Sequence, residues 1–432
     1  MNRCRRALLG IGLVCLLPLL SACQPTPEER LAAAEGHIAA ADYRTAAIEL
    51  RNLLQARPED SRGRLLLAEV SYQLGDFAEA SSQYERAIGF GETDAATWVA
   101  FGRALLSQGK ATEALDRVVP NLDDSSGDAS QDVFIGDVLY VLGNFDGALV
   151  SYKQAASSDP RNVLAIIGQA MVFAAKGELP TAEELLTKAQ DIDPESLSVW
   201  QARGALHVSG REFAEAARAF SRALEFETPQ TPLAESFSTR VNLVSSLIDA
   251  RQVDNASQSL EELRARFPDH PVATFLGGRL AFIRGDYDAA QLQLQNYLAS
   301  NPGDARGLAI LGAVNFSQKN LRQAEANLLS AVRANAGGQA ARRLLAETRL
   351  RLDDPSGALD ILQSASAAAQ SDSAYLSMLG RAQVAAGEEE AAIESFRTSL
   401  ERNPDDDAVR LSLASTYLQA NMTDSAIDLL DA

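Results

Sequence analysis

Cysteine is almost absent from this sequence. Only three of the 432 residues are cysteines, and they are Cys4, Cys15 and Cys23. The first two lie in an apolar N-terminal stretch, so a chain that loses this stretch keeps Cys23 alone. Such a chain can form no internal disulfide and no cysteine-based metal site. A sole cysteine at the start of the mature chain is most simply explained as an attachment point.

A long apolar run is also lacking at the N-terminus. The apolar stretch from Ala7 to Leu20 has 14 residues, and a membrane-spanning helix needs about 20. Three arginines precede it, at Arg3, Arg5 and Arg6. A basic start followed by a short apolar segment is typical of a secretory signal peptide. We expect residues 1–22 to be this signal.

Positive charge is scarce. The sequence has 39 Lys and Arg against 58 Asp and Glu, a net charge of −19. Because the leader holds three Arg and no acid, its removal changes −19 to −22. This balance argues against nucleic acid and against a polybasic membrane-binding surface.

Catalytic signatures are missing as well. There is no His-Glu-x-x-His for a metallopeptidase and no Gly-x-Ser-x-Gly nucleophile turn. The three histidines, His37, His207 and His270, lie far apart in the sequence, so we expect no shared metal. The sequence predicts neither a metal nor a cofactor, and it favours a non-enzymatic function.

What the sequence does have is a repeat of 34 residues. Its windows start at 27, 61, 95, 129, 163 and 197 and, after a shift of six residues, at 237, 271, 305, 339, 373 and 407. Position 20 is alanine in every window: Ala46, Ala80, Ala114, Ala148, Ala182, Ala216, Ala256, Ala290, Ala324, Ala358, Ala392 and Ala426. Position 8 is Gly or Ala except at Val244, position 15 is often Gly, and position 32 is Pro in six windows.

This pattern predicts two antiparallel helices in each window. Small residues at positions 8 and 20 let the helices approach closely, Gly at 15 supplies the positive φ that ends the first helix, and Pro at 32 ends the second. No such pair buries its apolar face alone, so neighbouring pairs stack. We expect repeats 1–6 over 27–230, an insertion at 231–236 and repeats 7–12 over 237–432. The insertion is expected to form a longer loop, with a change in superhelical path or a hinge as the alternatives. The chain stops inside the second helix of the last repeat, so we expect it to be truncated.

The pattern resembles the tetratricopeptide repeat. Trp98, Gly102 and Ala114 carry the resemblance in one window, and Trp200, Gly204, Ala216 and Phe220 carry it in another. The resemblance covers 27–432 and implies an all-α superhelical solenoid of about twelve helix hairpins. In this repeat the first helices line the concave face through positions 2, 5, 9 and 12.

The leader resembles that of bacterial lipoproteins. Leu20, Ser21, Ala22 and Cys23 match the motif in which the signal is cut before a cysteine that then carries acyl chains. The resemblance implies lipidation at Cys23 and a short linker over 23–26. Gln24 in place of Asp favours the outer membrane, facing the periplasm. The alternative is an ordinary cleaved signal that leaves Cys23 free.

A narrower resemblance rests on this leader and on the segments "AADYRTAAIELRNLLQARPED" and "LGDFAEASSQYERAIGFG". The leader and the two segments look like those of the tetratricopeptide lipoproteins of exosortase (PEP-CTERM) systems, which accompany exopolysaccharide genes. It implies a scaffold that binds proteins or peptide segments of an envelope export machinery. One alternative is an adaptor for outer-membrane or cell-wall enzymes. Another is the N-terminal part of a longer enzyme.

A candidate binding surface lies in repeats 8 and 9. Phe275, Arg279 and Phe282 occupy positions 5, 9 and 12 of one first helix, where spacings of four and three residues place them on one face. Arg306 and Phe316 come from the next first helix. Aromatic and Arg side chains are enriched at binding hot spots, and a basic patch in this acidic chain would attract an anionic segment. The alternative is that both kinds of side chain are used internally, in packing and in salt bridges.

Overall fold

The computed structural model describes residues 25–122, 127–334, 338–364 and 372–431. The expected signal peptide and Cys23 lie outside these residues. Within them the structure contains helices and no strand, so the predicted all-α class is confirmed.

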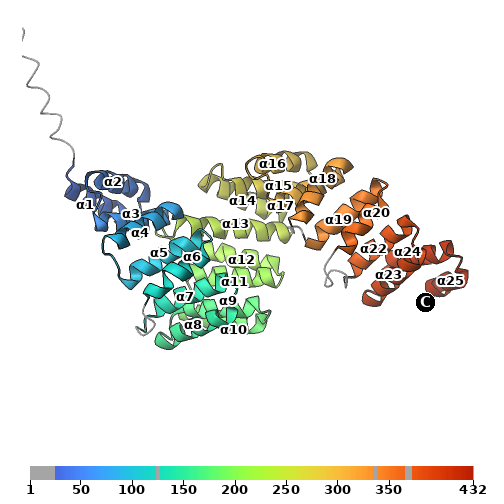
Figure 1. The fold of residues 1–432 in the computed structure, drawn as a ribbon, viewed down its shortest axis with the longest axis horizontal. Coiled ribbons are helices and arrows are strands. Elements are labelled where there is room, and N and C mark those ends of the chain that lie inside the picture. Colours follow the sequence, from blue (N-terminus) through green and yellow to red (C-terminus); the bar gives the residue numbers. More distant parts are fainter. Residues whose placement is uncertain (1–24, 123–126, 335–337, 365–371, 432) are drawn as a thin grey trace, which may run out of the picture. The chain divides into compact units, whose positions relative to one another are not determined.

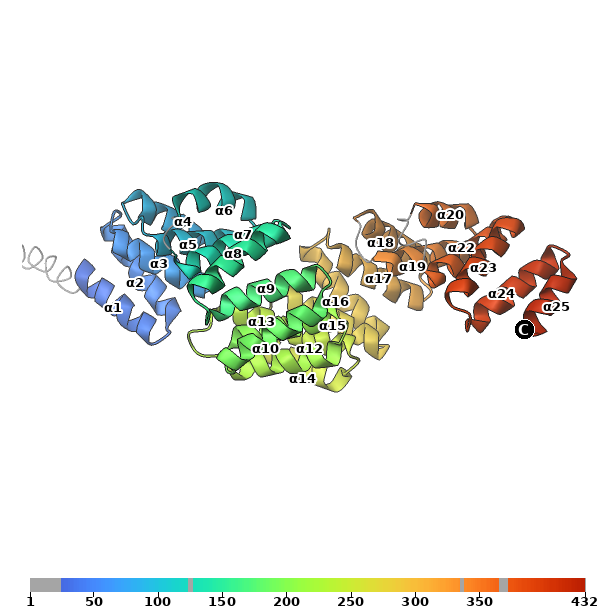
Figure 2. The ribbon, with the colours of Figure 1, turned by 90° about the horizontal axis from the view of Figure 1, so that it is seen from below.

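The helices form consecutive pairs. In chain order they are α1 (Pro27–Ala39), α2 (Tyr43–Ala56), α3 (Ser61–Gln73), α4 (Phe77–Gly89), α5 (Ala95–Ser107), α6 (Ala111–Arg117) with the short η1 (Val119–Asn121), α7 (Ala129–Val141), α8 (Phe145–Ser158), α9 (Val163–Ala175), α10 (Leu179–Ile192), α11 (Leu197–Ser209), α12 (Phe213–Glu225), α13 (Leu233–Asp249), α14 (Val253–Arg266), α15 (Pro271–Arg284), α16 (Tyr287–Ser300), α17 (Ala305–Ser317), α18 (Leu321–Arg333), α19 (Gly338–Arg351), α20 (Pro355–Gln363), α22 (Ser373–Ala386), α23 (Glu389–Arg402), α24 (Asp407–Gln419) and α25 (Thr423–Asp431). Neighbouring hairpins such as α15–α16 and α17–α18 lie side by side (Figure 1, Figure 2).

The helix starts follow the 34-residue windows. In ten of the twelve repeats the first helix begins at position 1 of the window. The residue before it is usually a capping residue, as at Asp60, Asn162 and Asp304, whose side chains accept a hydrogen bond from a backbone N–H in the first turn. Such caps satisfy N–H groups that the helix leaves unpaired. Successive hairpins therefore begin at the same position of the 34-residue window in most repeats.

Position 15 has a left-handed backbone in all twelve repeats. Six repeats have glycine there, for example Gly75 with φ +79°. The other six have Ala41, Arg211, Arg251, Lys319, Asp353 and Asn421, with φ between +55° and +63°. The predicted turn therefore forms even where the sequence does not supply the residue that favours it.

The alanines at position 20 form the centre of each hairpin. Eleven of them have no exposed surface and Ala426 is 2% exposed, so their predicted packing role is confirmed. In five of the six repeats that have glycine at position 8, this glycine makes room for the side chain at position 24 of the same repeat. A Cβ on Gly136 would lie 2.6 Å from the ring of Tyr152, and one on Gly380 would lie 2.7 Å from the ring of Phe396. These contacts leave no space for a larger residue.

The expectation of a longer loop at 231–236 is wrong for most of that segment. Helix α13 begins at Leu233, so the inserted residues lengthen the first helix of repeat 7 at its N-terminus. The hydroxyls of Ser238 and Thr239, in the repeat itself, donate to the carbonyl of Glu235 in the added part. Pro232 comes directly before the helix, at a place where its missing N–H costs nothing. Helix propensity at the start of repeat 7 thus turns an insertion into extra helix.

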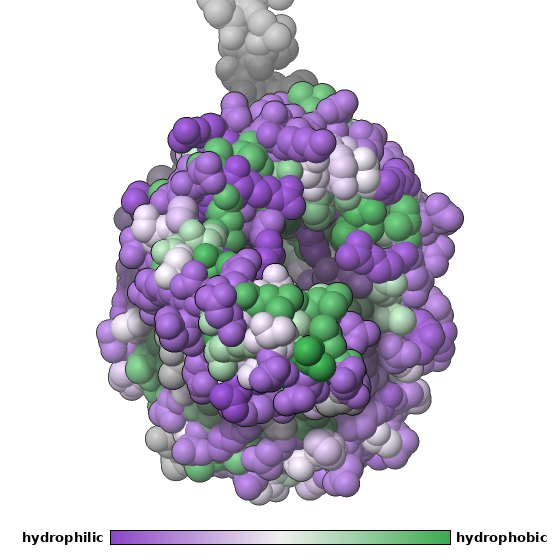
Figure 3. All heavy atoms as spheres, turned by 90° about the vertical axis from the view of Figure 1, so that its right-hand side faces the viewer, coloured by the Kyte–Doolittle hydropathy of each residue, from purple (hydrophilic) through white to green (hydrophobic). Residues whose placement is uncertain are grey.

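The described chain divides into two compact parts. We call residues up to Ser246 the N-terminal block and residues from Leu247 onward the C-terminal block. The last hairpin of the C-terminal block exposes apolar side chains among hydrophilic ones (Figure 3). Leu430 at position 24 is 53% exposed, whereas Leu294 and Leu328 at the same position are fully buried.

Candidate functional site

The predicted surface in repeats 8 and 9 is largely closed by its own contacts. Phe275 is only 9% exposed, and its ring centre lies 5.1 Å from that of Tyr297. The guanidinium groups of Arg279 and Arg306 lie 6.0 Å and 5.7 Å from the Phe275 ring centre. The structure thus brings these three predicted residues together. Neighbouring side chains cover most of the Phe275 ring, which leaves little of it accessible to a partner.

Partners within the chain occupy the other predicted residues. Nη2 of Arg279 lies 2.7 Å from Oδ1 of Asp249, which ends the preceding first helix. The half-buried Phe282 packs against Tyr287, and the guanidinium of Arg351 stands 4.3 Å above the ring of Phe316. Arg306 alone keeps a largely exposed side chain, 3.4 Å from Asp304. A binding role for these residues stays a prediction, and the contacts favour the internal use of their side chains.

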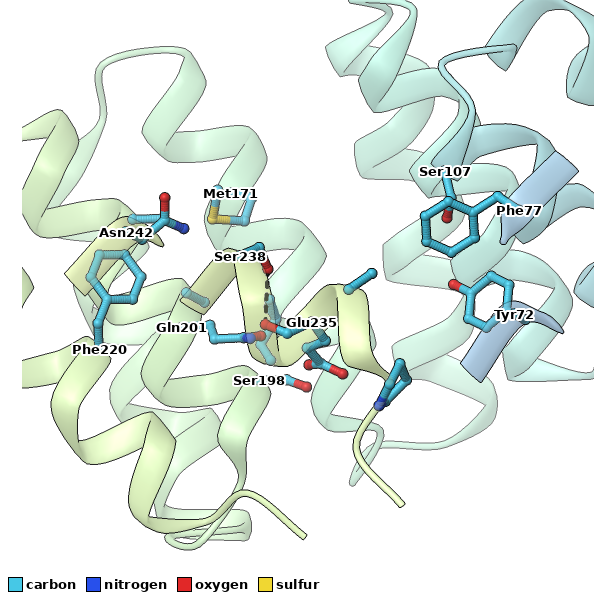
Figure 4. A pocket seen from close by; sticks show the side chains of 15 residues that line it. Tyr72, Phe77, Ser107, Met171, Ser198, Gln201, Phe220, Glu235, Ser238 and Asn242 are labelled. Atoms are coloured by element: carbon cyan, nitrogen blue, oxygen red, sulfur yellow. Dashed lines mark hydrogen bonds between the residues drawn. The ribbon is translucent and has the colours of Figure 1, made fainter. Parts of the chain in front are cut away.

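A more open site lies in the N-terminal block. Helices of repeats 2, 3, 5, 6 and 7 surround a pocket of about 560 Å³ (Figure 4). Tyr72 and Phe77, from α3 and α4, line one side of it, and Met171 and Phe220, from α9 and α12, line the other. The wall is completed by Pro232, directly before α13, and by Ala234 and Glu235 in the added part of α13. Residues about 160 positions apart therefore share one cavity.

A second pocket of about 440 Å³ adjoins the first. It shares Tyr72 and Ser107 with the larger pocket and extends along α5, α7 and α9 through Leu106, Tyr140 and Leu164. We call the two pockets together the groove. Tyr72 and Tyr140 occupy position 12 of their repeats, and each packs against an aromatic residue at position 17 with ring centres 5.2 Å and 5.6 Å apart. These pairs form a fixed apolar floor at two levels of the stack.

Exposed apolar side chains extend the floor to the solvent. Val141, at the end of α7, is 57% exposed, and Leu164, in the first turn of α9, is 46% exposed. Both line the smaller pocket. A concave surface with apolar walls and a few polar groups is the usual composition of a binding site. The groove can therefore remove apolar side chains of a ligand from water.

The groove also holds a half-buried carboxyl, that of Asp137. Burial raises the pKa of Asp137, and the hydroxyl of Tyr152 and the charge of Arg103 partly lower it again. The Tyr152 hydroxyl donates to Oδ1 of Asp137 at 2.8 Å. Burial next to this carboxyl also raises the pKa of Tyr152, so the phenol stays protonated and remains the donor. Asp137 and Tyr152 therefore form a hydrogen-bonded polar pair in a mostly apolar wall.

A second desolvated carboxyl stands in the larger pocket. Burial raises the pKa of Glu235, and a hydrogen bond from the side chain of Gln201 opposes that rise. The amide of Gln201 also donates to the hydroxyl of Thr239 at 2.6 Å. Glu235 is the one Asp, Glu, Lys or Arg among the residues that line this pocket. Sequence reasoning missed it because the six-residue insertion looked like a loop.

The three histidines have separate local roles. Nδ1 of His37 lies 3.3 Å from Asp42, and Nδ1 of His207 lies 2.7 Å from Glu212. His270 accepts from the N–H of Val272 and caps α15. Among the described residues there is no cluster of His, Cys, Asp and Glu that could hold a metal ion. None of the helices in the same residues combines the length and the apolar character needed to cross a bilayer.

A curated protein matches part of this chain. A tetratricopeptide repeat protein 21 homolog from Caenorhabditis briggsae is 25% identical over 222 residues, which is 49% of this chain. The matched part is 16% of that protein, so the chain spans about a sixth of its curated relative.

Among solved structures, the Cut9–Hcn1 hetero-tetramer of the APC/C has a similar chain. The match covers 96% of this chain and 88% of that one, at 17% identity and a TM-score of 0.50. Yeast Tom70 matches over 91% of this chain and 89% of that one, at 14% identity and a TM-score of 0.48. The first likeness supports the solenoid fold alone.

Family models match most of the chain. A tetratricopeptide repeat-like domain covers 28–168. Two tetratricopeptide repeat models cover 142–206 with 383–432, and 241–305 with 275–321. The stacked helix hairpins are therefore tetratricopeptide repeats, and the chain belongs to the family of proteins built from them.

Proposed function

We propose that this chain is a non-enzymatic scaffold of the bacterial envelope that binds protein segments in the groove of repeats 2–7. Tetratricopeptide repeats indicate a protein–protein interaction scaffold, and solenoids of this fold are typically non-catalytic. The observation that carries the proposal is the groove itself, with its aromatic pairs and its exposed Val141 and Leu164. Exposed apolar side chains that gather in a hollow are typical of an interaction site.

We further propose that the scaffold is attached to the membrane through acyl chains on Cys23 and faces the periplasm. The support is the leader, with its basic start, its short apolar run and the motif Leu-Ser-Ala-Cys. The process we favour is exopolysaccharide export with an exosortase system, which rests on the resemblance of the N-terminal repeats. Several acyl chains hold a protein on a membrane where one does so only marginally.

The groove is tested by placing charge on its exposed apolar residues. The double variant Val141→Glu, Leu164→Glu changes only side chains that already face solvent, so it should fold normally. The matched control is Ile48→Glu, Val150→Glu, because these residues are at least half exposed and lie on second helices outside the groove. We expect the groove variant to lose partners that wild type and control both capture from envelope extract. Capture of the same partners by all three would refute the groove as the binding site.

The anchor is tested by Cys23→Ser. This variant should accumulate as an unprocessed precursor without label from fed fatty acid, and should leave the membrane-bound lipoprotein fraction. Labelling equal to that of wild type would exclude Cys23 as the attachment point. Loss of secreted polysaccharide on deletion of the gene, restored by wild type and not by Cys23→Ser, would connect the anchor with the export process.

A further inference from the structure

The added part of α13 closes the groove against repeat 2. A Cβ on Gly75 would lie 3.9 Å from the Cβ of Ala234, so α13 reaches the turn between α3 and α4. Glu235 follows Ala234 and lines the pocket together with Tyr72 and Phe77 (Figure 4). The insertion has therefore placed a carboxylate in a cavity that is otherwise apolar or uncharged.

Glu235 has no cation of its own. No Lys or Arg in the described part of the chain lies within ion-pair distance of its carboxylate. The nearby Arg240 of the same helix is already used: it lies 2.7 Å from Glu227 and donates to the carbonyl and hydroxyl of Ser236. A half-buried carboxylate without a paired cation is unfavourable, since it has lost water and gained only the Gln201 amide. Acids held in this way are a frequent mark of binding sites.

We propose that Glu235 receives the ammonium or guanidinium group of a Lys or Arg side chain that a bound protein segment inserts into this pocket. The inference rests on the proposed function, because it assumes that the groove holds a protein segment. Tyr72 and Phe77 line the same cavity and offer apolar surface to the methylene stem of such a side chain. Long basic side chains bury their stems in this manner while the charged end finds a polar partner.

Charge selects this occupant over others. A carboxylate or phosphate would be repelled by Glu235, in a chain that already carries a net charge of −19. A purely apolar side chain would leave Glu235 with less water and no new partner. A cation supplies the missing counter-charge, and charge-assisted hydrogen bonds are roughly twice as strong as neutral ones. The groove thus favours a segment with a basic residue flanked by apolar residues.

The test uses two peptides and the purified full chain in detergent, with a detergent-only blank. The peptides are acetyl-Ser-Leu-Lys-Leu-Ser-amide and its counterpart with Gln in place of Lys. We expect wild type to bind the Lys peptide about tenfold more tightly, the size of one charge-assisted hydrogen bond. Glu235→Gln should remove that preference by weakening only the Lys peptide. The matched control Glu195→Gln, at an exposed acid outside the groove, should keep it.

Three results would overturn the inference. The first is an unchanged Lys-peptide affinity in Glu235→Gln. The second is binding of putrescine as tight as that of the Lys peptide, which would indicate a site for a free amine. The third comes from Glu235→Lys, which should prefer a peptide with Glu at the central position and would contradict us if it did not.

The two proposals fail separately. Equal binding of both peptides by wild type, with partners still lost in the Val141→Glu, Leu164→Glu variant, would remove the cation site and leave the scaffold function standing. Retention of partners by that double variant would instead refute the groove. Circular dichroism of each variant shows whether it is folded.

Discussion

The first-helix faces of the two blocks use charge in opposite ways. In the C-terminal block, arginines at these positions pair with acids of neighbouring helices, as Arg279 does with Asp249 and Arg381 with Glu347, at 2.7 Å and 2.8 Å. In the N-terminal block, the acids Asp137 and Glu235 are desolvated and the pKa of each is raised. The arginines on the C-terminal face are paired with acids of the same block, whereas the acids on the N-terminal face lack a full counter-charge. A binding site is better located by such unmet charge than by the presence of Arg and Phe.

The hairpins of the two blocks should be packed equally tightly. Overpacking a buried alanine in each block tests this, and it should have the largest effect on stability of the changes considered. Ala182→Leu in the N-terminal block and Ala324→Leu in the C-terminal block each add bulk at a fully buried position. Each should lower the free energy of unfolding by about 1–3 kcal/mol, seen as a lower denaturant midpoint by circular dichroism. Exposed Ala326→Leu is the control and should change little. A loss in one block only would mean that the scaffolds differ.

Removal of the paired acid Glu347 tests the salt bridges of the C-terminal block. Glu347 lies 2.8 Å from Arg381 and 2.9 Å from Arg351, and its side chain is 15% exposed. The contact with Arg381 is a charge contact whose angles are not those of a hydrogen bond. Glu347→Gln should lower the free energy of unfolding by about 1 kcal/mol, because both arginines can rehydrate. Exposed Glu394→Gln should have no effect, and equal effects of the two would argue against the pairing.

Removal of a desolvated acid should have the opposite sign. Asp137→Asn keeps an oxygen that accepts from Tyr152 and removes the charge that burial disfavours. Because the pKa of Asp137 is raised on folding, the folded state holds its proton more tightly and this acid costs stability as pH rises above its unfolded pKa. Asp137→Asn should therefore be more stable than wild type at pH 7, with a gain that disappears toward about pH 4.

Denaturation of both proteins across this pH range measures the effect. A variant that is less stable than wild type at pH 7 would show that Arg103 and Tyr152 more than offset the burial of the carboxylate, and the contrast between the two faces would then fail at this residue.

The smallest effect concerns the turns. Repeats 2–5 have glycine at position 15, whereas repeat 7 has Arg251 there at φ +59°. Arg251→Gly should raise the free energy of unfolding by about 0.5 kcal/mol, since relief of the left-handed strain is partly cancelled by the greater freedom of glycine in the unfolded chain. Gly285→Ala, in the next repeat at φ +80°, should be destabilising. Thermal melts of the two variants should move in opposite directions, and a shared direction would contradict the strain argument.

The fold could be predicted from sequence because it depends on local pattern. Ala182 and its equivalents recur every 34 residues, and short-range helix packing determines what such a position does. The site could not be predicted in the same way. The ion pair of Arg279 with Asp249 and the packing of Phe275 on Tyr297 both depend on how neighbouring helices are placed. The meeting of Tyr72 with Glu235 depends on the curvature of six stacked repeats, to which each repeat contributes a small rotation.

One signal in the sequence could have indicated part of the site. The inserted segment Thr231-Pro-Leu-Ala-Glu-Ser236 has a proline followed by helix-forming residues, which is typical of a helix start and not of a loop. Extension of α13 by about one turn would have followed from that observation. Its contact with repeat 2 would still have required the structure.

The closing contact between Ala234 and Gly75 has a consequence for how this chain can change in evolution. A plain stack of hairpins tolerates the gain or loss of a whole unit by unequal recombination, because each end meets the same kind of neighbour. Between repeats 2 and 7 the stack must instead bring α13 into contact with the turn of repeat 2. A duplication or deletion of a repeat there would therefore separate the two sides of the cavity. We expect related sequences to keep the number of repeats in this segment constant and to vary in length elsewhere.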